Sequence, residues 1–356
     1  MMKKNLLILL GLALLFSLAA CAAGPAPAQT GTAPAQTDAA AEKLSVVTTI
    51  FPEYDWLRQI VGETDGVELT LLLDRGVDLH SYQPSVDDIV KISTCDLFVY
   101  VGGESDEWVE DVLEDVTNPA MRVVNLLEVL GDAVKEEELV EGMEAEHDHD
   151  HEDEEHEDGE HEDEDHEDEE HEHEEEGPEY DEHVWLSLKN AAALCRALAG
   201  ELEALDGANK AAYEINAAAY IEKLEALDGA YAAAVEAGNK KTLLFADRFP
   251  FRYLVDDYGL SYYAAFAGCS AESEASFETV LFLANKVDEL GLSCVLQIES
   301  ADGSIAKTVC DTAQSENLTV LTMDSLQSAT AVEVAAGATY LSVMEKNLEV
   351  LKQALQ

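Results

Sequence analysis

Histidines are the residues of this chain whose number and spacing are best suited to chemistry. Eight of the ten fall within residues 136–182, which we call the acidic tract and which also holds thirty Asp or Glu residues and no Lys or Arg. Imidazole nitrogen is a good zinc ligand, and carboxylate oxygens can complete a coordination shell. The tract therefore predicts auxiliary, low-affinity metal sites, the alternative being a solvated acidic loop with incidental histidines. Its histidines are His147, His149, His151, His156, His161, His166, His171 and His173.

The other two histidines lie where a folded site is expected. His80 is in a predicted loop after a strand, and His183 is where the acidic tract gives way to a predicted helix. In open α/β sheets, ligands bind at the carboxyl ends of the strands, where such loops gather. We therefore predict that both imidazoles are metal ligands, although a single histidine is more often an ordinary hydrogen-bonded residue.

The formal net charge of −55 limits the classes of partner that this chain can bind. So acidic a protein is repelled by nucleic acid and by anionic membrane surfaces, and cations are its natural small partners. The acidic tract has too few apolar side chains to offset the entropy cost of folding, so we expect it to be disordered. The sequence contains no HExxH, GxSxG or P-loop motif, so we expect no enzyme activity, a zinc hydrolase being the alternative.

The N-terminal segment is typical of an export signal. Two lysines precede an apolar run over residues 6–18, which is too short to span a bilayer comfortably. The run ends in Leu-Ala-Ala directly before Cys21, a pattern that resembles a bacterial lipobox. We expect residues 1–20 to be removed, Cys21 to carry lipid, and residues 21–43 to form a flexible tether. The alternative is an ordinary signal peptide with a nearby cysteine.

Export also permits disulfides among the other cysteines. Five remain after Cys21, so at least one thiol is unpaired or paired elsewhere. No CxxC spacing occurs, which argues against a cysteine zinc knuckle, and Cys95 and Cys294 precede strand-like runs that favour core positions. The five are Cys95, Cys195, Cys269, Cys294 and Cys310.

Strand-like and helix-like segments alternate on both sides of the acidic tract, which indicates α/β lobes with mostly parallel sheets. We expect an N-terminal lobe at residues 44–207, a linking helix at 208–237 that is long for a globular protein, and a C-terminal lobe at 238–356. The expected strands cover residues 45–50, 67–73, 97–101 and 122–126 in the first lobe and 242–246, 294–298 and 320–323 in the second.

Several motifs in order along the chain resemble the metal-specific solute-binding proteins of bacterial ABC importers for zinc and manganese. Residues 79–89 are similar to that family's first metal-histidine loop, and residues 96–103 to the strand that follows it. Residues 183–186 resemble the second metal-histidine motif, and residues 320–326 the strand and aspartate that close the site. The resemblance implies a ligand held between two lobes and a rigid linking helix that limits lobe closure. A His-rich insertion directly before the second histidine is typical of the zinc-importing branch.

The resemblance also implies a set of metal ligands that includes His80, His183 and Asp324. The family's third ligand, a His or Glu five residues before a tyrosine, falls on Arg248, which stays protonated and cannot bind a metal. We therefore expect its neighbour Asp247 to be the third ligand. The alternative is that Asp247 only pairs with Arg248, and that water or the acidic tract completes the shell.

Four further residues have expected roles around this site. Cys269, on a loop of the second lobe, is a remote candidate ligand. Glu299 resembles a glutamate of many relatives and is expected to support the lobe or the ligands rather than to bind metal. Tyr82 and Trp185 adjoin the two histidines and are expected to pack over them and fix their orientation, plain core positions being the alternative.

The resemblance implies that the chain is the high-affinity extracytoplasmic zinc-binding component of an ABC importer. It is expected to capture Zn²⁺ and deliver it to the transmembrane permease, as a monomer anchored by lipid at the cell surface or in the periplasm. Two imidazoles and one or two carboxylates suit four-coordinate zinc, and Mn²⁺ is the alternative cargo. A surface metal-binding adhesin is the alternative role.

Overall fold

The computed structural model of the protein describes residues 43–144, 179–270 and 274–356. Several predicted features lie outside the described residues. They are the signal peptide, the lipidation site at Cys21, the tether as far as residue 42 and the eight tract histidines. Among the helices that the structure describes, none combines the length and the apolar character needed to cross a membrane.

Four parallel strands form the sheet of the N-terminal lobe, in the order β2-β1-β3-β4. The inner strands are rich in β-branched and aromatic residues, as expected for a parallel sheet that is covered on both faces. Val46, Val47 and Phe98 at their centre are at most 1% exposed. The strands are β1 (Leu44–Thr48), β2 (Val67–Leu71), β3 (Leu97–Tyr100) and β4 (Arg122–Asn125).

A second sheet of four parallel strands, in the order β6-β5-β7-β8, forms the C-terminal lobe. Strand β6 is absent from the strands predicted from the sequence. Three of its seven residues are alanine, which has a low strand propensity, and pairing with β5 decides its conformation. The strands are β5 (Thr242–Phe249), β6 (Ser261–Ala267), β7 (Cys294–Ile298) and β8 (Thr319–Met323).

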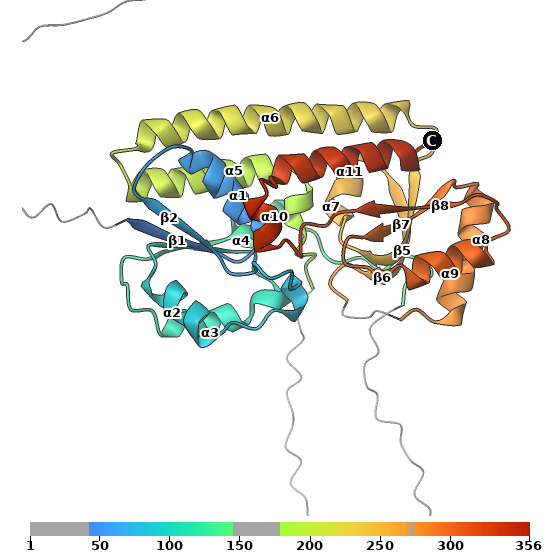
Figure 1. Cartoon of the computed structure of the whole chain (residues 1–356), viewed down its shortest axis with the longest axis horizontal. Coiled ribbons are helices and arrows are strands. Elements are labelled where there is room, and N and C mark those ends of the chain that lie inside the picture. The colour runs from blue at the N-terminus through green and yellow to red at the C-terminus, as the bar shows by residue number, and fades with distance from the viewer. Residues whose placement is uncertain (1–42, 145–178, 271–273) are drawn as a thin grey trace, which may run out of the picture. The chain divides into compact units, whose positions relative to one another are not determined.

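A helix of 28 residues, α6 (Lys210–Ala237), links the two lobes and runs beside α5 and α11 (Figure 1). It buries three tyrosines, Tyr213, Tyr220 and Tyr231, along the face that packs on these helices. The predicted class, two α/β lobes with parallel sheets joined by a long helix, is confirmed. The other helices are α1 (Phe51–Val61), α2 (Val86–Thr94), α3 (Trp108–Glu114), α4 (Leu126–Leu130), α5 (Leu188–Leu205), α7 (Arg252–Tyr258), α8 (Phe277–Leu290), α9 (Ser304–Thr312), α10 (Ala331–Ala335) and α11 (Tyr340–Ala354).

The two ends of the acidic tract have a defined structure, so the predicted disordered range of residues 136–182 is too wide. Glu136 forms an antiparallel bridge with Tyr180, and Glu144 forms a parallel bridge with Phe266 of β6. Both ends are anchored by backbone hydrogen bonds and by apolar contacts with the hydrophobic core. The physical reason is that residues 136–144 still contain apolar side chains that can be buried.

Candidate metal centre

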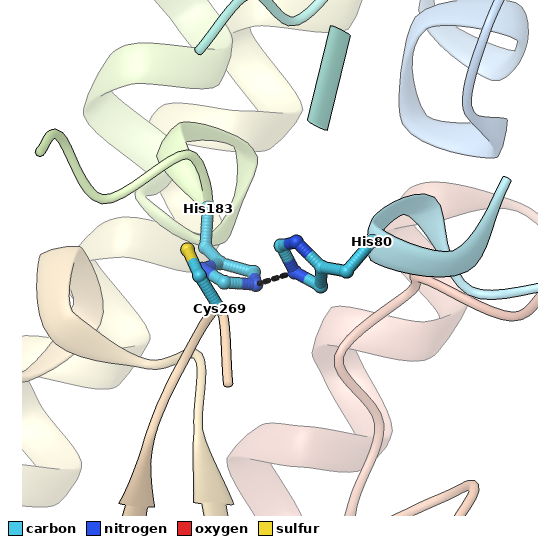
Figure 2. A group of neighbouring side chains, drawn as sticks. All are labelled: His80, His183 and Cys269. Atoms are coloured by element: carbon cyan, nitrogen blue, oxygen red, sulfur yellow. Dashed lines mark hydrogen bonds between the residues drawn. The ribbon is translucent and has the colours of Figure 1, made fainter. Parts of the chain in front are cut away.

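Three loops bring two histidines and a cysteine together (Figure 2). His80 lies in the short 3₁₀ helix that follows β2, and His183 directly precedes a 3₁₀ turn that leads into α5. Cys269 lies just beyond the end of β6. One ligand atom of each residue lies within 4.8 Å of the other two. We call this group the His–His–Cys cluster, and all three side chains are of types that bind zinc.

The two imidazoles of the cluster face each other through their Nε2 atoms, which lie 3.1 Å apart. Two nitrogens bound to one tetrahedral zinc at 2.0–2.1 Å lie about 3.3 Å apart. His183 is wholly buried and the His80 side chain is only 6% exposed. The spacing and the burial therefore fit two ligands of a single ion that is shielded from water.

Local hydrogen bonds fix the backbone on which the two histidines sit. The Asp78 carboxylate accepts the backbone N–H of His80 at 3.1 Å and begins the short helix around it. Four residues after His183, the Ser187 hydroxyl accepts the N–H of Asn190 at 3.1 Å and starts α5. His80 thus lies in a capped short helix, and His183 lies four residues before the capped start of α5.

The remaining nitrogen of each imidazole has a partner outside the cluster. His183 Nδ1 lies 3.0 Å from Asp181 Oδ1, and His80 Nδ1 lies 2.7 Å from Ser105 Oγ. The Asp181 carboxylate accepts from Nδ1 and so directs the lone pair of His183 to Nε2, whereas the Ser105 hydroxyl can donate or accept and fixes the orientation of the His80 ring. Burial, and then the neighbouring His183, lower the pKa of His80 to about 3, so its imidazole is neutral at physiological pH.

Carboxylates surround the open side of the cluster. Burial raises the pKa of Glu182 to about 7, one of its oxygens accepts the N–H of Ser105 at 2.8 Å, and the other lies 3.5 Å from His80 Nδ1. A cavity of about 190 Å³ adjoins this carboxyl group. The acidic residues that line this cavity favour the approach of a cation. The cavity is lined by His80, Glu104, Ser105, Glu137, Glu179, Tyr180, Glu182 and Cys269.

Gln327 contacts both imidazoles, and the sequence did not predict this residue as part of the site. Its amide nitrogen lies 2.9 Å from His80 Nε2 and 2.5 Å from His183 Nε2. The side chain is buried, at the centre of the cluster rather than at its edge. The only sequence signal for this position is that it follows the carboxyl end of β8 within a few residues.

Asp324, expected to be a ligand, is not part of the His–His–Cys cluster. Its Oδ1 atom accepts the N–H of Leu326 at 2.9 Å, and its backbone carbonyl accepts the amide of Asn347 at 2.7 Å. Burial, and then the charge of Glu299, raise the pKa of Asp324 to about 6. Leu326 has a left-handed backbone (φ 64°), which is unusual for leucine, so the chain reverses and Gln327 points at the histidines instead.

Asp247, expected to be the third ligand, also lies outside the cluster. Its two oxygens accept the N–H groups of Arg248 at 2.9 Å and of Ile298 at 3.0 Å. Burial raises the pKa of this carboxyl group. The guanidinium of Arg248 binds Asp78 at 2.8 Å instead of pairing with Asp247. Both oxygens of Asp247 are thus engaged by the backbone of the C-terminal lobe.

The two aromatic residues beside the histidines differ in their contacts. The Trp185 ring lies 5.2 Å from the His183 ring, and its N–H donates to the backbone carbonyl of Ser325 at 2.8 Å. Tyr82 packs edge-on against Trp108 at 5.8 Å and donates to Asp88 at 3.1 Å, away from His80. Trp185 therefore packs beside His183, whereas Tyr82 is a core residue whose hydroxyl binds Asp88 in the first turn of α2.

Glu299 supports the turn that carries Gln327. Its carboxylate accepts hydrogen bonds from the backbone N–H and the hydroxyl of Ser325, at 2.7 and 2.8 Å, and from the Ser328 hydroxyl at 3.1 Å. These contacts agree with an expected supporting role. The five cysteines within the described residues are free thiols, three of them buried in the core.

Comparison with known proteins places this architecture in one family. Residues 46–354 match the family described as zinc-uptake complex component A, periplasmic. The zinc-binding lipoprotein AdcA of Streptococcus pneumoniae is 34% identical over 87% of this chain and 56% of its own length. The high-affinity zinc uptake system protein ZnuA of Bacillus subtilis is 30% identical over 96% of this chain and 97% of its own length.

A solved structure agrees with these matches. The Zn(II)-bound ZnuA-like domain of S. pneumoniae AdcA superposes with a TM-score of 0.64 at 30% identity, covering 88% of this chain and 99% of that domain. The chain spans about half the length of the AdcA relatives that it matches. The predicted family is confirmed: this chain belongs to the family of zinc-uptake complex component A.

Proposed function

We propose that this chain captures Zn²⁺ between its two lobes for uptake by an ABC importer. The observation that carries the proposal is the pair of buried imidazoles, His80 and His183, whose Nε2 atoms lie 3.1 Å apart with their Nδ1 atoms engaged elsewhere. Imidazoles fixed in this way are common protein ligands of zinc. The family match, and relatives named as zinc-binding or zinc-uptake proteins, support zinc as the cargo.

The donor types favour zinc over manganese. Manganese prefers several oxygen ligands. In the described part of the chain, the group of side chains suited to holding a metal contains two nitrogen donors and one sulfur donor. Asp247 and Asp324, the carboxylates that left manganese possible at the level of sequence, accept hydrogen bonds from backbone N–H groups. Zinc is therefore the cargo that we propose.

Delivery requires a membrane partner and an anchor. We propose that residues 1–20 are a lipoprotein signal peptide, that Cys21 carries lipid, and that residues 21–43 tether the folded part to the membrane. The protein then acts outside the cytoplasm as a monomer and passes zinc to a transmembrane permease. A relative named as a lipoprotein and a family described as a periplasmic component of an uptake complex support this arrangement.

The acidic tract has a separate part in this proposal. Its eight histidines gather zinc in weak sites and raise the local concentration of zinc near the cavity. The described ends of the tract support this, because Glu137, Glu179 and Glu182 line the cavity that adjoins His80.

The test uses a variant that lacks residues 147–176, so that the tract histidines do not contribute. Zinc and manganese affinities are measured by competition with a chromophoric chelator, and metal content by mass spectrometry. We expect one tightly bound zinc per chain, weaker manganese, and loss of tight zinc in His80→Ala. Asp324→Asn is the control, because the new amide oxygen can still accept the N–H of Leu326. Absence of tight zinc, or tighter manganese, would contradict the proposal.

A further inference from the structure

Cys269 is the member of the His–His–Cys cluster that the proposed function does not explain. It is one of five described cysteines, and it alone lies beside the two imidazoles. Of the others, Cys95, Cys195 and Cys294 are buried in hydrophobic surroundings and Cys310 lies on α9. Figure 2 shows the Cys269 sulfur next to the His183 ring, on a separate loop from either histidine.

The backbone before Cys269 is fitted closely to His183. A Cβ atom on Gly268 would lie 3.0 Å from His183 Cε1, 3.1 Å from its Nδ1 and 2.9 Å from the backbone oxygen of Phe249. Glycine is therefore needed for the loop to approach the imidazole so closely. The backbone N–H of Cys269 donates to Glu137 at 3.1 Å, which fixes the loop on the other side.

Arg248 holds the cysteine loop against the loop of His80. Its guanidinium binds Asp78, whose carboxylate also accepts the N–H of His80, and it donates to the backbone carbonyl of Ser270 at 3.3 Å. Arginine presents several donors in a rigid fork and can bind two loops at once. The position of Cys269 is thus set from both lobes rather than by its own loop alone.

The distances agree with a shared ion. The three ligand atoms lie within 4.8 Å of one another. In a tetrahedral site with Zn–N of 2.0–2.1 Å and Zn–S of 2.3 Å, sulfur and nitrogen lie about 3.6 Å apart, so a side-chain adjustment of about 1 Å closes the site. Burial, and then the charges of Asp181, Glu182 and Glu137, raise the pKa of the Cys269 thiol, so its proton leaves when a cation takes its place.

We infer that the Cys269 thiolate would be the third protein ligand of the captured ion, beside the imidazoles of His80 and His183. The inference rests on the proposed function, because it concerns the same ion. Binding forms a metal–sulfur bond and releases the thiol proton to solvent. A sulfur donor favours zinc and other soft ions over manganese, which adds to selectivity.

The test replaces zinc by Co²⁺ in the variant that lacks residues 147–176. Thiolate bound to Co²⁺ gives a near-ultraviolet charge-transfer band, which nitrogen and oxygen ligands do not produce. We expect this band in the unchanged site, its loss in Cys269→Ser, and its retention in Cys310→Ser, the matched control. Zinc affinity of Cys269→Ser is expected to fall at least about tenfold, because even groups outside the coordination shell are worth 10–100-fold.

X-ray absorption of the zinc form gives a second measurement that needs no substitution. A zinc–sulfur distance of about 2.3 Å is expected. Tight zinc with only nitrogen and oxygen neighbours, or a Cys269→Ser variant of unchanged affinity, overturns the inference but leaves zinc capture standing. Absence of tight zinc in the unchanged protein overturns the proposed function itself.

Discussion

The hydrogen bond between Asp181 and His183 makes a quantitative prediction for metal affinity. Asp181 Oδ1 lies 3.0 Å from His183 Nδ1 and also accepts the backbone N–H of His183 at 2.8 Å. Metal binding at Nε2 makes the Nδ1 proton more acidic, so this bond strengthens when the ion arrives. Asp181→Asn keeps the size of the side chain and an acceptor oxygen but removes the charge.

The magnitude follows from the difference between two kinds of hydrogen bond. A bond to a charged group contributes about 1.5–3 kcal/mol, and a neutral one about 0.5–1.5 kcal/mol. The difference of about 1–1.5 kcal/mol corresponds to a loss of about tenfold in zinc affinity. This value lies at the lower end of the 10–100-fold range measured for groups that support metal ligands.

The assay is a zinc competition titration at fixed pH, in protein that lacks residues 147–176. Asp257→Asn is the matched control, because Asp257 binds Ser187 and Lys189 at the start of α5 and does not contact either histidine. An Asp181→Asn variant with unchanged affinity would refute the argument that Asp181 orients His183. An equal loss of zinc affinity in the control would show that the change in the protein's net charge causes the effect.

Three further outcomes test other parts of the reasoning. Deletion of residues 147–176 should leave the affinity of the tight site unchanged, as measured by zinc titration; loss of that site would show that the tract supplies ligands. Tyr253→Phe should lower the free energy of unfolding by about 1–3 kcal/mol in urea, because the Tyr253 hydroxyl donates to Asp181 O at 2.7 Å and accepts Lys135 N–H at 3.0 Å. Without metal, the contribution of Asp106 to the unfolding free energy should fall by at most about 3 kcal/mol as the pH rises from 4 to 8, since burial raises the pKa of Asp106 to about 6 and the folded state holds that proton more tightly than the unfolded state. Glu182 and Asp324, whose pKa values are also raised, add to this fall in the same direction. Asp106→Asn should flatten this profile, and an unchanged slope would assign it to other carboxyl groups.

The sequence predicts the strands and helices of the fold better than it predicts the residues around the candidate metal centre. Apolar strand runs and helical periodicity locate the long helix and seven of the eight strands in the described residues, because burial in a parallel sheet leaves a local pattern. Strand β6 leaves no such pattern, since it is specified by pairing with β5. His80 and His183 could be singled out because each lies at an element boundary, although their role as ligands stays a prediction.

The position of Gln327 could not be predicted in the same way. It depends on the left-handed backbone of Leu326 and on the hydrogen bond from Leu326 N–H to Asp324. Sequence spacing does not record this turn, because leucine carries no preference for a left-handed conformation.

Arg248 occupies the position at which the resemblance implies a metal ligand, and its contacts in the structure give it a different role. At the level of sequence, an arginine there only removes a donor. In the structure its guanidinium binds Asp78 beneath His80 and the carbonyl of Ser270 next to Cys269. If Cys269 is a ligand, as we propose, the arginine that supplies no donor of its own holds the sulfur-bearing loop and the loop of His80 together. Arg248 and Cys269 would then contribute to one site.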